Sequence, residues 1–179
     1  MKLDRYTEKA QEAIVAAQRL ATDAESPILD AEHLLAALIE DPEGIPAAIL
    51  SQLNADPTAL AAELGGVLGR RARVRGSSLS LDPRARQLLE RAEEEAKHLK
   101  DEYVSTEHLL LAASRAGGDA QRLLDQFGAG HEQILKALQQ VRGGQRVTSP
   151  HPESTYQSLE KYGRDLTSDA RAGKPSRRL

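Results

Sequence analysis

Glu32-His33-Leu34-Leu35 occurs twice in this chain, and its second copy, Glu107-His108-Leu109-Leu110, lies 75 residues later. Asp30 comes shortly before the first copy and Ser105 before the second, and both residue types cap the start of helices well. Each copy also leads into an apolar run. Four shared residues carry weight only if the flanking sequence repeats in the same register.

The sequence around the two copies does repeat. At the same offset Thr7 aligns with Asp82, and both residue types are suited to capping a helix. Three alanines of the first half align with three of the second, namely Ala10, Ala17 and Ala21 with Ala85, Ala92 and Ala96. When the offset is shortened to 74 residues, which allows for one deleted residue, the later apolar and helix-ending positions of the two halves also align. We infer an internal duplication of one helical unit.

Apolar spacing, capping residues and Gly or Pro stops predict four helices in each half. The expected ranges are 8–24, 30–40, 45–53 and 57–68 in the first half, and 83–100, 105–115, 120–127 and 131–141 in the second. Each short helix has one apolar face to bury, and the sister unit offers a matching face. We therefore predict an all-α fold, in which two pseudo-symmetric four-helix repeats pack as one globular domain.

The predicted domain occupies residues 1–142. Repeat one covers about 1–69 and repeat two 81–142, with a connector at 70–80 between them. The connector is rich in Gly, Ser and Arg, which predicts a flexible basic segment. Residues 143–153 are expected to form a linker, and residues 154–179 a short, weakly helical tail with a divergent end.

Composition limits what kind of protein this is. The net charge of −3 gives no overall basic field for nucleic acid, and the arginines of the connector lack the interleaved aromatic residues of a base-stacking surface. A solvated connector is therefore favoured over nucleic-acid contact. The sequence has no cysteine, no signal-peptide pattern at its start and no apolar run of the roughly 18–20 residues that cross a bilayer. We expect a cytoplasmic protein without a membrane partner.

The sequence shows few signs of catalytic chemistry. No phosphate-binding loop of the form G-x-x-x-x-G-K-[ST] is present. No serine is accompanied by a histidine and a carboxylate in a sequence context that suggests a catalytic triad. His33 and His108 each lack a second histidine at metal-ligand spacing, so we interpret them as bonding backbone groups at a helix start. We expect no enzymatic activity, cofactor or metal site in this chain.

Glu32 and Glu107 leave two interpretations open. Each is expected in the first turn of a helix, where the helix dipole favours a carboxylate, and that role alone accounts for them. In pseudo-symmetric repeats the two carboxylates are also presented equivalently, and they could bind cationic or amide groups of a partner. Asp101 and Glu102 would add negative charge beside the second copy.

Longer stretches resemble a known family. The repeats, the opening residues 1–7 and the run 101–109 are similar to the double Clp N-terminal repeat of Clp-type AAA+ unfoldases and disaggregases. Residues 153–167 and 170–174 resemble the junction between the N-domain and the first ATPase module in the ClpB type. After Lys174 the likeness ends, so we expect a member truncated before that module.

The resemblance implies a substrate-recognition module. Such an N-domain binds unfolded or aggregated polypeptides through a shallow groove and passes them to an ATP-driven ring. ATP and magnesium would belong only to the missing ATPase modules. In full-length form the resemblance implies a homohexameric ring, a DnaK-type partner system and a role in the stress response. Two alternatives remain: a ClpC-like N-domain recognising adaptors or phosphoarginine-marked proteins, and a free-standing adaptor acting in trans.

The resemblance also implies contact residues. Carried onto this sequence, the rim of the groove would hold Thr7, Asp101 and Glu107, whereas phosphoarginine recognition would use Glu32 and Glu107. A groove floored by small side chains such as Ala10 and Ala13 would accept apolar segments. Ile14 and Leu109 are expected near that floor.

Overall fold

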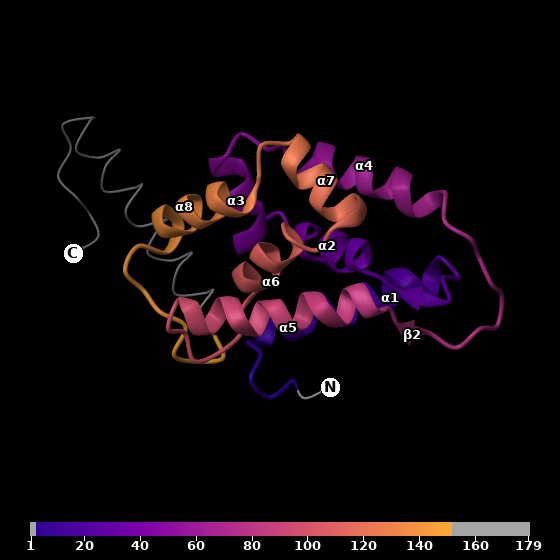
Figure 1. The fold of residues 1–179 in the computed structure, drawn as a ribbon, viewed down its shortest axis with the longest axis horizontal. Helices are drawn as coiled ribbons and strands as arrows, with labels where there is room; N and C mark the ends of the chain where they lie inside the picture. The colour runs from indigo at the N-terminus through magenta and orange to yellow at the C-terminus, as the bar shows by residue number, and fades with distance from the viewer. Residues whose placement is uncertain (1–2, 152–179) are drawn as a thin grey trace.

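The computed structural model describes residues 3–151, which form eight helices and two short strands (Figure 1). In chain order these are α1 (Glu8–Asp23), β1 (Ile28–Leu29), α2 (Ala31–Ile39), α3 (Ile45–Gln52), α4 (Pro57–Gly69), β2 (Ser80–Leu81), α5 (Pro83–His98), α6 (Thr106–Ala113), α7 (Gly118–Gln126) and α8 (His131–Arg142). All eight predicted helices are present, and each end falls within two residues of its predicted place. The all-α prediction is confirmed.

Side-chain hydrogen bonds cap the N-termini of several of these helices. The Thr7 hydroxyl accepts a hydrogen bond from the Ala10 backbone N–H at 3.2 Å, as expected of an N-cap. The Asp82 carboxylate accepts one from the Arg84 N–H at 3.0 Å and caps α5 in the same way. Pro83 then occupies the first turn of α5, where its missing N–H costs nothing.

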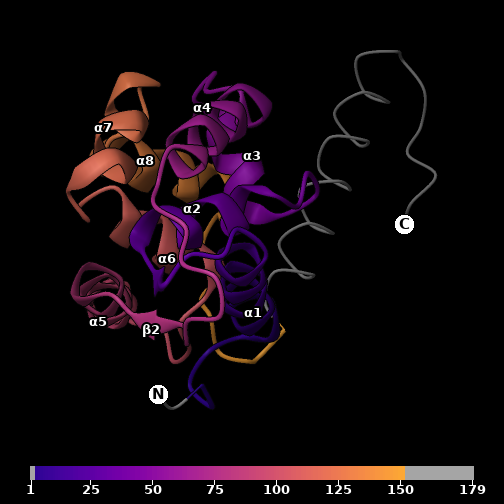
Figure 2. The same ribbon diagram turned by 90° about the vertical axis from the view of Figure 1, so that its right-hand side faces the viewer.

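The repeated segments form the centre of the molecule. Every residue of α6 is buried, as are eight of the nine residues of α2. Both views place α1 and α5 on one side of this central pair, and α3, α4, α7 and α8 on the other (Figures 1 and 2). Equivalent helices of the two repeats therefore occupy equivalent layers, and one continuous core of mainly Leu, Ile and Ala runs through both.

Two parallel strand contacts join the repeats. β1 and β2 pair with Ile28 opposite Ser80 and Leu29 opposite Leu81. A single parallel bridge joins Tyr6 to Val104, and at the 75-residue offset it is the counterpart of the Leu29–Leu81 pair. In each contact, the residue before the N-cap of the first helix of one repeat pairs with the residue before the N-cap of the second helix of the other. The sequence pattern predicted no strands, because segments this short show no alternation.

The segments that follow each repeat both contact the domain. In the connector the Val74 N–H donates to the Glu25 carbonyl at 2.8 Å, which links this stretch to the segment after α1. Residues 143–151, here named the strap, return across the domain, and Val147 is part of the core. The packed region therefore continues beyond the boundary predicted at residue 142. The helical tail predicted in 154–179 lies outside the described residues.

Candidate functional site

All seven residues predicted to contact a polypeptide are buried. None exposes more than 8 % of its surface: Thr7, Ala10, Ile14, Glu32, Asp101, Glu107 and Leu109. In this conformation their side chains lie beneath the surface, so direct contact with a bound chain stays a prediction. The four polar members instead have partners inside the domain, and those partners show what the residues do.

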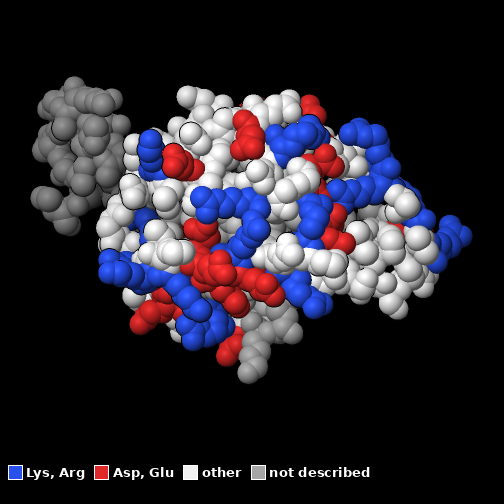
Figure 3. All heavy atoms as spheres, viewed as in Figure 1, with Lys and Arg blue, Asp and Glu red and all other residues white. Residues whose placement is uncertain are grey.

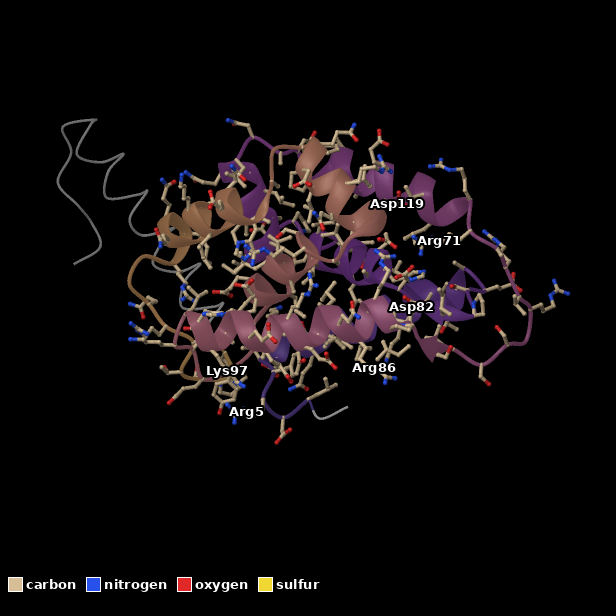
Figure 4. The ribbon with its side chains drawn as sticks, in the orientation of Figure 1. Arg5, Arg71, Asp82, Arg86, Lys97 and Asp119 are labelled. Atoms are coloured by element: carbon tan, nitrogen blue, oxygen red, sulfur yellow. The ribbon has the colours of Figure 1, made fainter. Side chains whose placement is uncertain are left out.

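Glu32 lies in an ion cluster formed with Asp30, Arg71 and Arg84, here named the first cluster. Arg71 bonds to both carboxylates, and Arg84 Nη2 donates to Glu32 Oε2 at 2.7 Å. Ala120, in the first turn of α7, donates its backbone N–H to the same Glu32 oxygen at 2.8 Å. Arg71 also approaches Asp119 to 3.7 Å, and both are labelled in Figure 4. Glu32 thus joins the first repeat to the second.

The two carboxyl groups of the first cluster titrate differently. Burial alone would raise the pKa of Glu32, but hydrogen bonds from Arg84, Arg71 and the Ala120 N–H outweigh it and lower the pKa to about 2. Burial and the neighbouring Glu32 charge raise the pKa of Asp30 despite the same two arginines. Asp30 is therefore the member of the pair that takes up a proton first as the pH falls.

Glu107 lies in a second cluster with Asp101, Ser105, His108 and Arg142. Arg142 Nη1 donates to Asp101 Oδ2 at 3.0 Å and to Glu107 Oε2 at 3.1 Å. Burial acts to raise the pKa of Asp101, but hydrogen bonds from His108, the Val147 N–H and Arg142 outweigh it, and the pKa is lowered. This second cluster is more deeply buried than the first, since its arginine side chain is 7 % exposed against 24 % for Arg71.

Each glutamate has an arginine partner near the end of its own repeat. Arg71 comes two residues after α4, and Arg142 is the last residue of α8, so each first-turn glutamate binds an arginine from the end of its own repeat. These pairs were not predicted from the sequence. The available signal was an arginine at or just after the end of the fourth helix in each repeat. Glu32 differs because it also binds Arg84 and α7 across the repeat boundary.

The interpretation of the two histidines is confirmed. The Asp30 N–H donates to His33 Nδ1 at 3.0 Å, and the Ser105 N–H donates to His108 Nδ1 at 2.8 Å. Each imidazole thereby closes a capping box at the start of its helix. Burial, reinforced by the Arg71 charge, lowers the pKa of His33, which keeps that ring neutral and able to accept the bond.

Ser105, His108 and Asp101 form a chain with the order of a hydrolase triad. Ser105 Oγ lies 3.0 Å from His108 Nδ1, and His108 Nε2 lies 2.7 Å from Asp101 Oδ2. However, Ser105 and His108 have no exposed surface, and the Ser105 hydroxyl donates to Glu107 Oε1. A substrate cannot reach this oxygen, so the arrangement serves as internal support for the start of α6.

The first groove, of about 470 Å³, lies between α1, the start of α3 and the start of α6. Its lining combines small or aliphatic side chains with charged ones: Lys9, Glu12, Ala13, Ala16, Arg19, Ala37, Leu38, Glu40, Asp41, Glu43, Gly44, Ile45, Pro46 and Thr106. Ala13 was expected in a groove floor and is present here. None of the seven predicted contact residues lines this groove, but Thr106 lies directly between Ser105 and Glu107 of the second cluster.

A second groove, of about 380 Å³, occupies the related place in repeat two. It is lined by Arg91, Glu94, Glu95, His98, Ala112 and Arg115. At the 75-residue offset Ala112 corresponds to Ala37, Glu94 to Arg19 and Arg115 to Glu40, so the sign of the charge is reversed at two corresponding positions. Arg91 bonds to the Arg115 carbonyl across this groove. Figure 3 shows acidic side chains in a band along α5, with Lys and Arg on both sides.

Neither a metal site nor a membrane-spanning helix is found in residues 3–151. In that range no cluster of three or more His, Asp or Glu side chains is placed to hold a metal ion. None of the helices in the same range is long and apolar enough to cross a membrane.

The sequence is similar to known chaperones. Residues 5–127 match the Clp repeat (R) N-terminal domain family. The chain is 42 % identical to the chaperone protein ClpB of Bacillus cereus over 179 residues, which covers 97 % of this chain and 21 % of that protein. It is 39 % identical to ClpB of Mycobacterium tuberculosis over 170 residues, covering 94 % of this chain and 20 % of that protein. The chain therefore spans about a fifth of the length of these relatives.

Solved structures share the fold. The Hsp104 N-terminal domain from Candida albicans matches with a TM-score of 0.74 and 21 % identity, over 84 % of this chain and 99 % of that one. The N-terminal domain of ClpD from Arabidopsis thaliana matches with a TM-score of 0.59 and 21 % identity, over 78 % of this chain and 98 % of that one.

Proposed function

This chain belongs to the Clp repeat (R) N-terminal domain family, and from that membership we propose that its first groove binds unfolded or aggregated polypeptide. The resemblance noted in the sequence is confirmed, and the chain corresponds to the N-terminal region of ClpB chaperones. We assign no catalytic step to this domain. Its contribution is to hold a client chain.

The observation that carries the proposal is the lining of the first groove. Three alanines, Ala13, Ala16 and Ala37, leave room for a peptide backbone to approach α1 and α2 closely. Leu38, Ile45 and Pro46 are buried behind these alanines and make the wall apolar, and charged side chains surround it. Shallow apolar contact of this kind binds many sequences weakly, which suits a module that handles diverse clients.

The remaining parts of the proposal concern the longer relatives. In a full-length ClpB-type protein the captured segment would pass to an ATP-driven homohexameric ring that works with a DnaK-type system in the cytoplasm. The relatives are about five times as long as this chain, which leaves ample length for such modules. ATP and magnesium would bind there.

The phosphoarginine alternative is less favoured by the two clusters. Glu32 already bonds to the guanidinium groups of Arg71 and Arg84, and Glu107 to that of Arg142. A guanidinium from outside would have to displace these partners and enter a buried position. Because the neighbouring internal bonds are charge-assisted, that exchange would gain little free energy.

The role that we assign to Thr7, Asp101 and Glu107 is indirect: they position the walls of the first groove. Asp101 and Glu107 hold Arg142 and the start of α6, and Thr106 at that start lines the first groove. Thr7 caps α1, which supplies five of the lining residues. Substitutions at these three residues would change binding by moving the walls of the groove.

Filling the groove tests the proposal. We expect Ala16→Phe to weaken binding of a reduced, carboxymethylated model protein at least fivefold, because the new ring occupies the space between α1 and α2. Gln18→Phe, on an exposed position of the same helix, adds a comparable ring outside the groove and should leave binding within twofold. Fluorescence anisotropy measures both affinities, and circular dichroism checks that both variants stay helical. Equal binding by the two variants would place the client elsewhere.

A further inference from the structure

We propose that the first groove selects client segments that are both aliphatic and cationic, and that the acidic loop after α2 reads the positive charge. The inference rests on the proposed function, because it concerns the same groove. It adds a substrate class and names Glu40 and Glu43 as the residues that determine it.

The charge of the lining is the first observation. Four carboxylates, those of Glu12, Glu40, Asp41 and Glu43, face two cations, Lys9 and Arg19. Lys9 and Glu12 form an ion pair at 3.4 Å within α1, so their charges largely cancel. The loop side of the groove therefore keeps an excess of negative charge. A concave surface between apolar walls concentrates that potential and attracts cations.

The apolar floor is the second observation. Lys and Arg side chains bury their methylene stems against apolar surface while the charged group stays in water. The half-buried Ala13 and Ala16 supply such a surface, and Glu40 and Glu43 at the rim are exposed. A bound Lys or Arg can therefore lay its stem on the floor and extend its charge to the loop.

Thr106 is the third observation. Its side chain lines the groove and is 6 % exposed. Its hydroxyl is the one buried side-chain polar atom in residues 3–151 that lacks a hydrogen-bond partner. Leaving such a group unpaired costs free energy, and a peptide backbone in the groove can supply the missing bond once the atoms that cover the hydroxyl move aside. The unpaired hydroxyl points to a polypeptide ligand in a way that the acidic loop alone does not.

The second groove lacks these features. Arg115 stands where the first groove has Glu40, and Arg91 reaches across to the Arg115 carbonyl. Its two arginines balance Glu94 and Glu95, so this groove has no excess of negative charge to attract a cationic segment, and part of the space is already filled. Of the two related grooves, only the first is suited to the proposed ligand.

Three synthetic peptides test the selection. They share the same leucine and valine positions and carry Lys, Gln or Glu at alternate positions between them. Measured by fluorescence anisotropy on the 179-residue chain, the Lys peptide should bind about five- to tenfold more tightly than the Gln peptide, and the Glu peptide more weakly still. The preference should shrink in 0.5 M salt, because exposed charges are screened.

Charge variants locate the effect. Glu40→Gln with Glu43→Gln should remove most of the preference for the Lys peptide and leave affinity for the Gln peptide within twofold. Arg19→Gln removes the opposing cation from the same groove, so it should strengthen Lys-peptide binding about two- to threefold. Glu90→Gln with Glu94→Gln is the matched control, because it makes the same change in net charge on exposed positions of α5. It should leave the preference intact.

Failures of the two proposals give different results. If all three peptides bind with equal affinity and Ala16→Phe abolishes binding, the groove binds clients but the charge selection is wrong. If none of the peptides responds to Ala16→Phe, the proposed function itself is wrong. If the Glu90 and Glu94 control weakens Lys-peptide binding as much as the loop variant does, net charge explains the preference and the loop has no special role.

Discussion

Glu32 does more for this domain than stabilise the start of its helix. Its two carboxylate oxygens bind Arg71 at the end of repeat one, Arg84 on α5 and the backbone of α7. The side chain has no exposed surface, so all of these bonds are made away from water. A charge buried this way stabilises the fold only while every partner is in place.

Replacing Glu32 by Gln should therefore lower the free energy of unfolding by about 3 kcal/mol at pH 7. The pKa of Glu32 is lowered from 4.5 to about 2, and each unit corresponds to about 1.4 kcal/mol. Because the folded pKa lies below the unfolded one, this stability is complete above about pH 4.5 and is lost as the pH falls towards about 2. Urea unfolding at pH 7 and pH 2.5 measures both differences.

The expected pattern is a large deficit at pH 7 that becomes small at pH 2.5. Glu63→Gln, on an exposed position of α4, serves as the control and should change stability by less than about 0.5 kcal/mol. A deficit of equal size at both pH values would show that the charge of Glu32 is not what stabilises the fold.

The sequence predicted local roles well and distant partners poorly. Thr7, Asp82 and the two histidines act within their own helix starts, so spacing along the chain identified them. The arginine partners of the glutamates are 35 to 52 residues away. Local pattern carries no information about such pairs, because they form only when the repeats pack.

Among the helices, α7 shows how tightly one element can be held by another. Arg84 of α5 inserts beside its start and donates to the Gly117 carbonyl at 3.0 Å. A Cβ atom on Gly118 would lie 2.7 Å from Arg84 Cζ, and Gly118 also has a φ of +57°. Glycine is therefore needed there for both space and backbone conformation.

Gly118→Ala should destabilise the domain by about 2–3 kcal/mol, whereas Gly128→Ala should cost about 1 kcal/mol. Gly128 has a comparable φ of +77°, but no heavy atom lies within 4 Å of an added Cβ. The cost of Gly128→Ala therefore reflects only the strain of a positive φ in a residue other than glycine. Chemical denaturation measures both. In an Arg84→Ala background the excess cost at Gly118 should disappear. If it persists there, Arg84 is not the cause.

The first groove could not be located from the sequence. The 3.6-residue period identified the apolar faces of the helices, and these became the core. The groove instead uses Ala13, Ala16 and the 40–46 segment, which lie at the edge of those faces. Ala10 and Ile14 are one helical turn or less away from this edge, and packing buried them completely. Which small residues remain accessible depends on how the loop after α2 lies against α1.

Taken whole, the two repeats form a single folding unit. Their strand contacts are exchanged between repeats, and the core has no internal boundary. Leu35 in α2 and Leu110 in α6 are equivalent residues at its centre, and both have no exposed surface.

Leu35→Ala and Leu110→Ala should each cost about 2–5 kcal/mol and lower hydrogen-exchange protection in both repeats to a similar extent. A shared core is lost as a unit, so circular dichroism and exchange should report one transition. Loss of protection confined to the substituted repeat would show instead that the repeats unfold independently.

The strap determines how the domain would bear a pulling force. Tension on the chain beyond residue 151 first reaches the hydrogen bond from the Glu8 N–H to the Pro150 carbonyl. It next reaches the bonds of Val147 to Asp101 and Glu102. These anchors lie at the start of α1 and just after α5, so the load enters where the two repeats meet. The last helix, α8, is shielded from that load until the anchors give way.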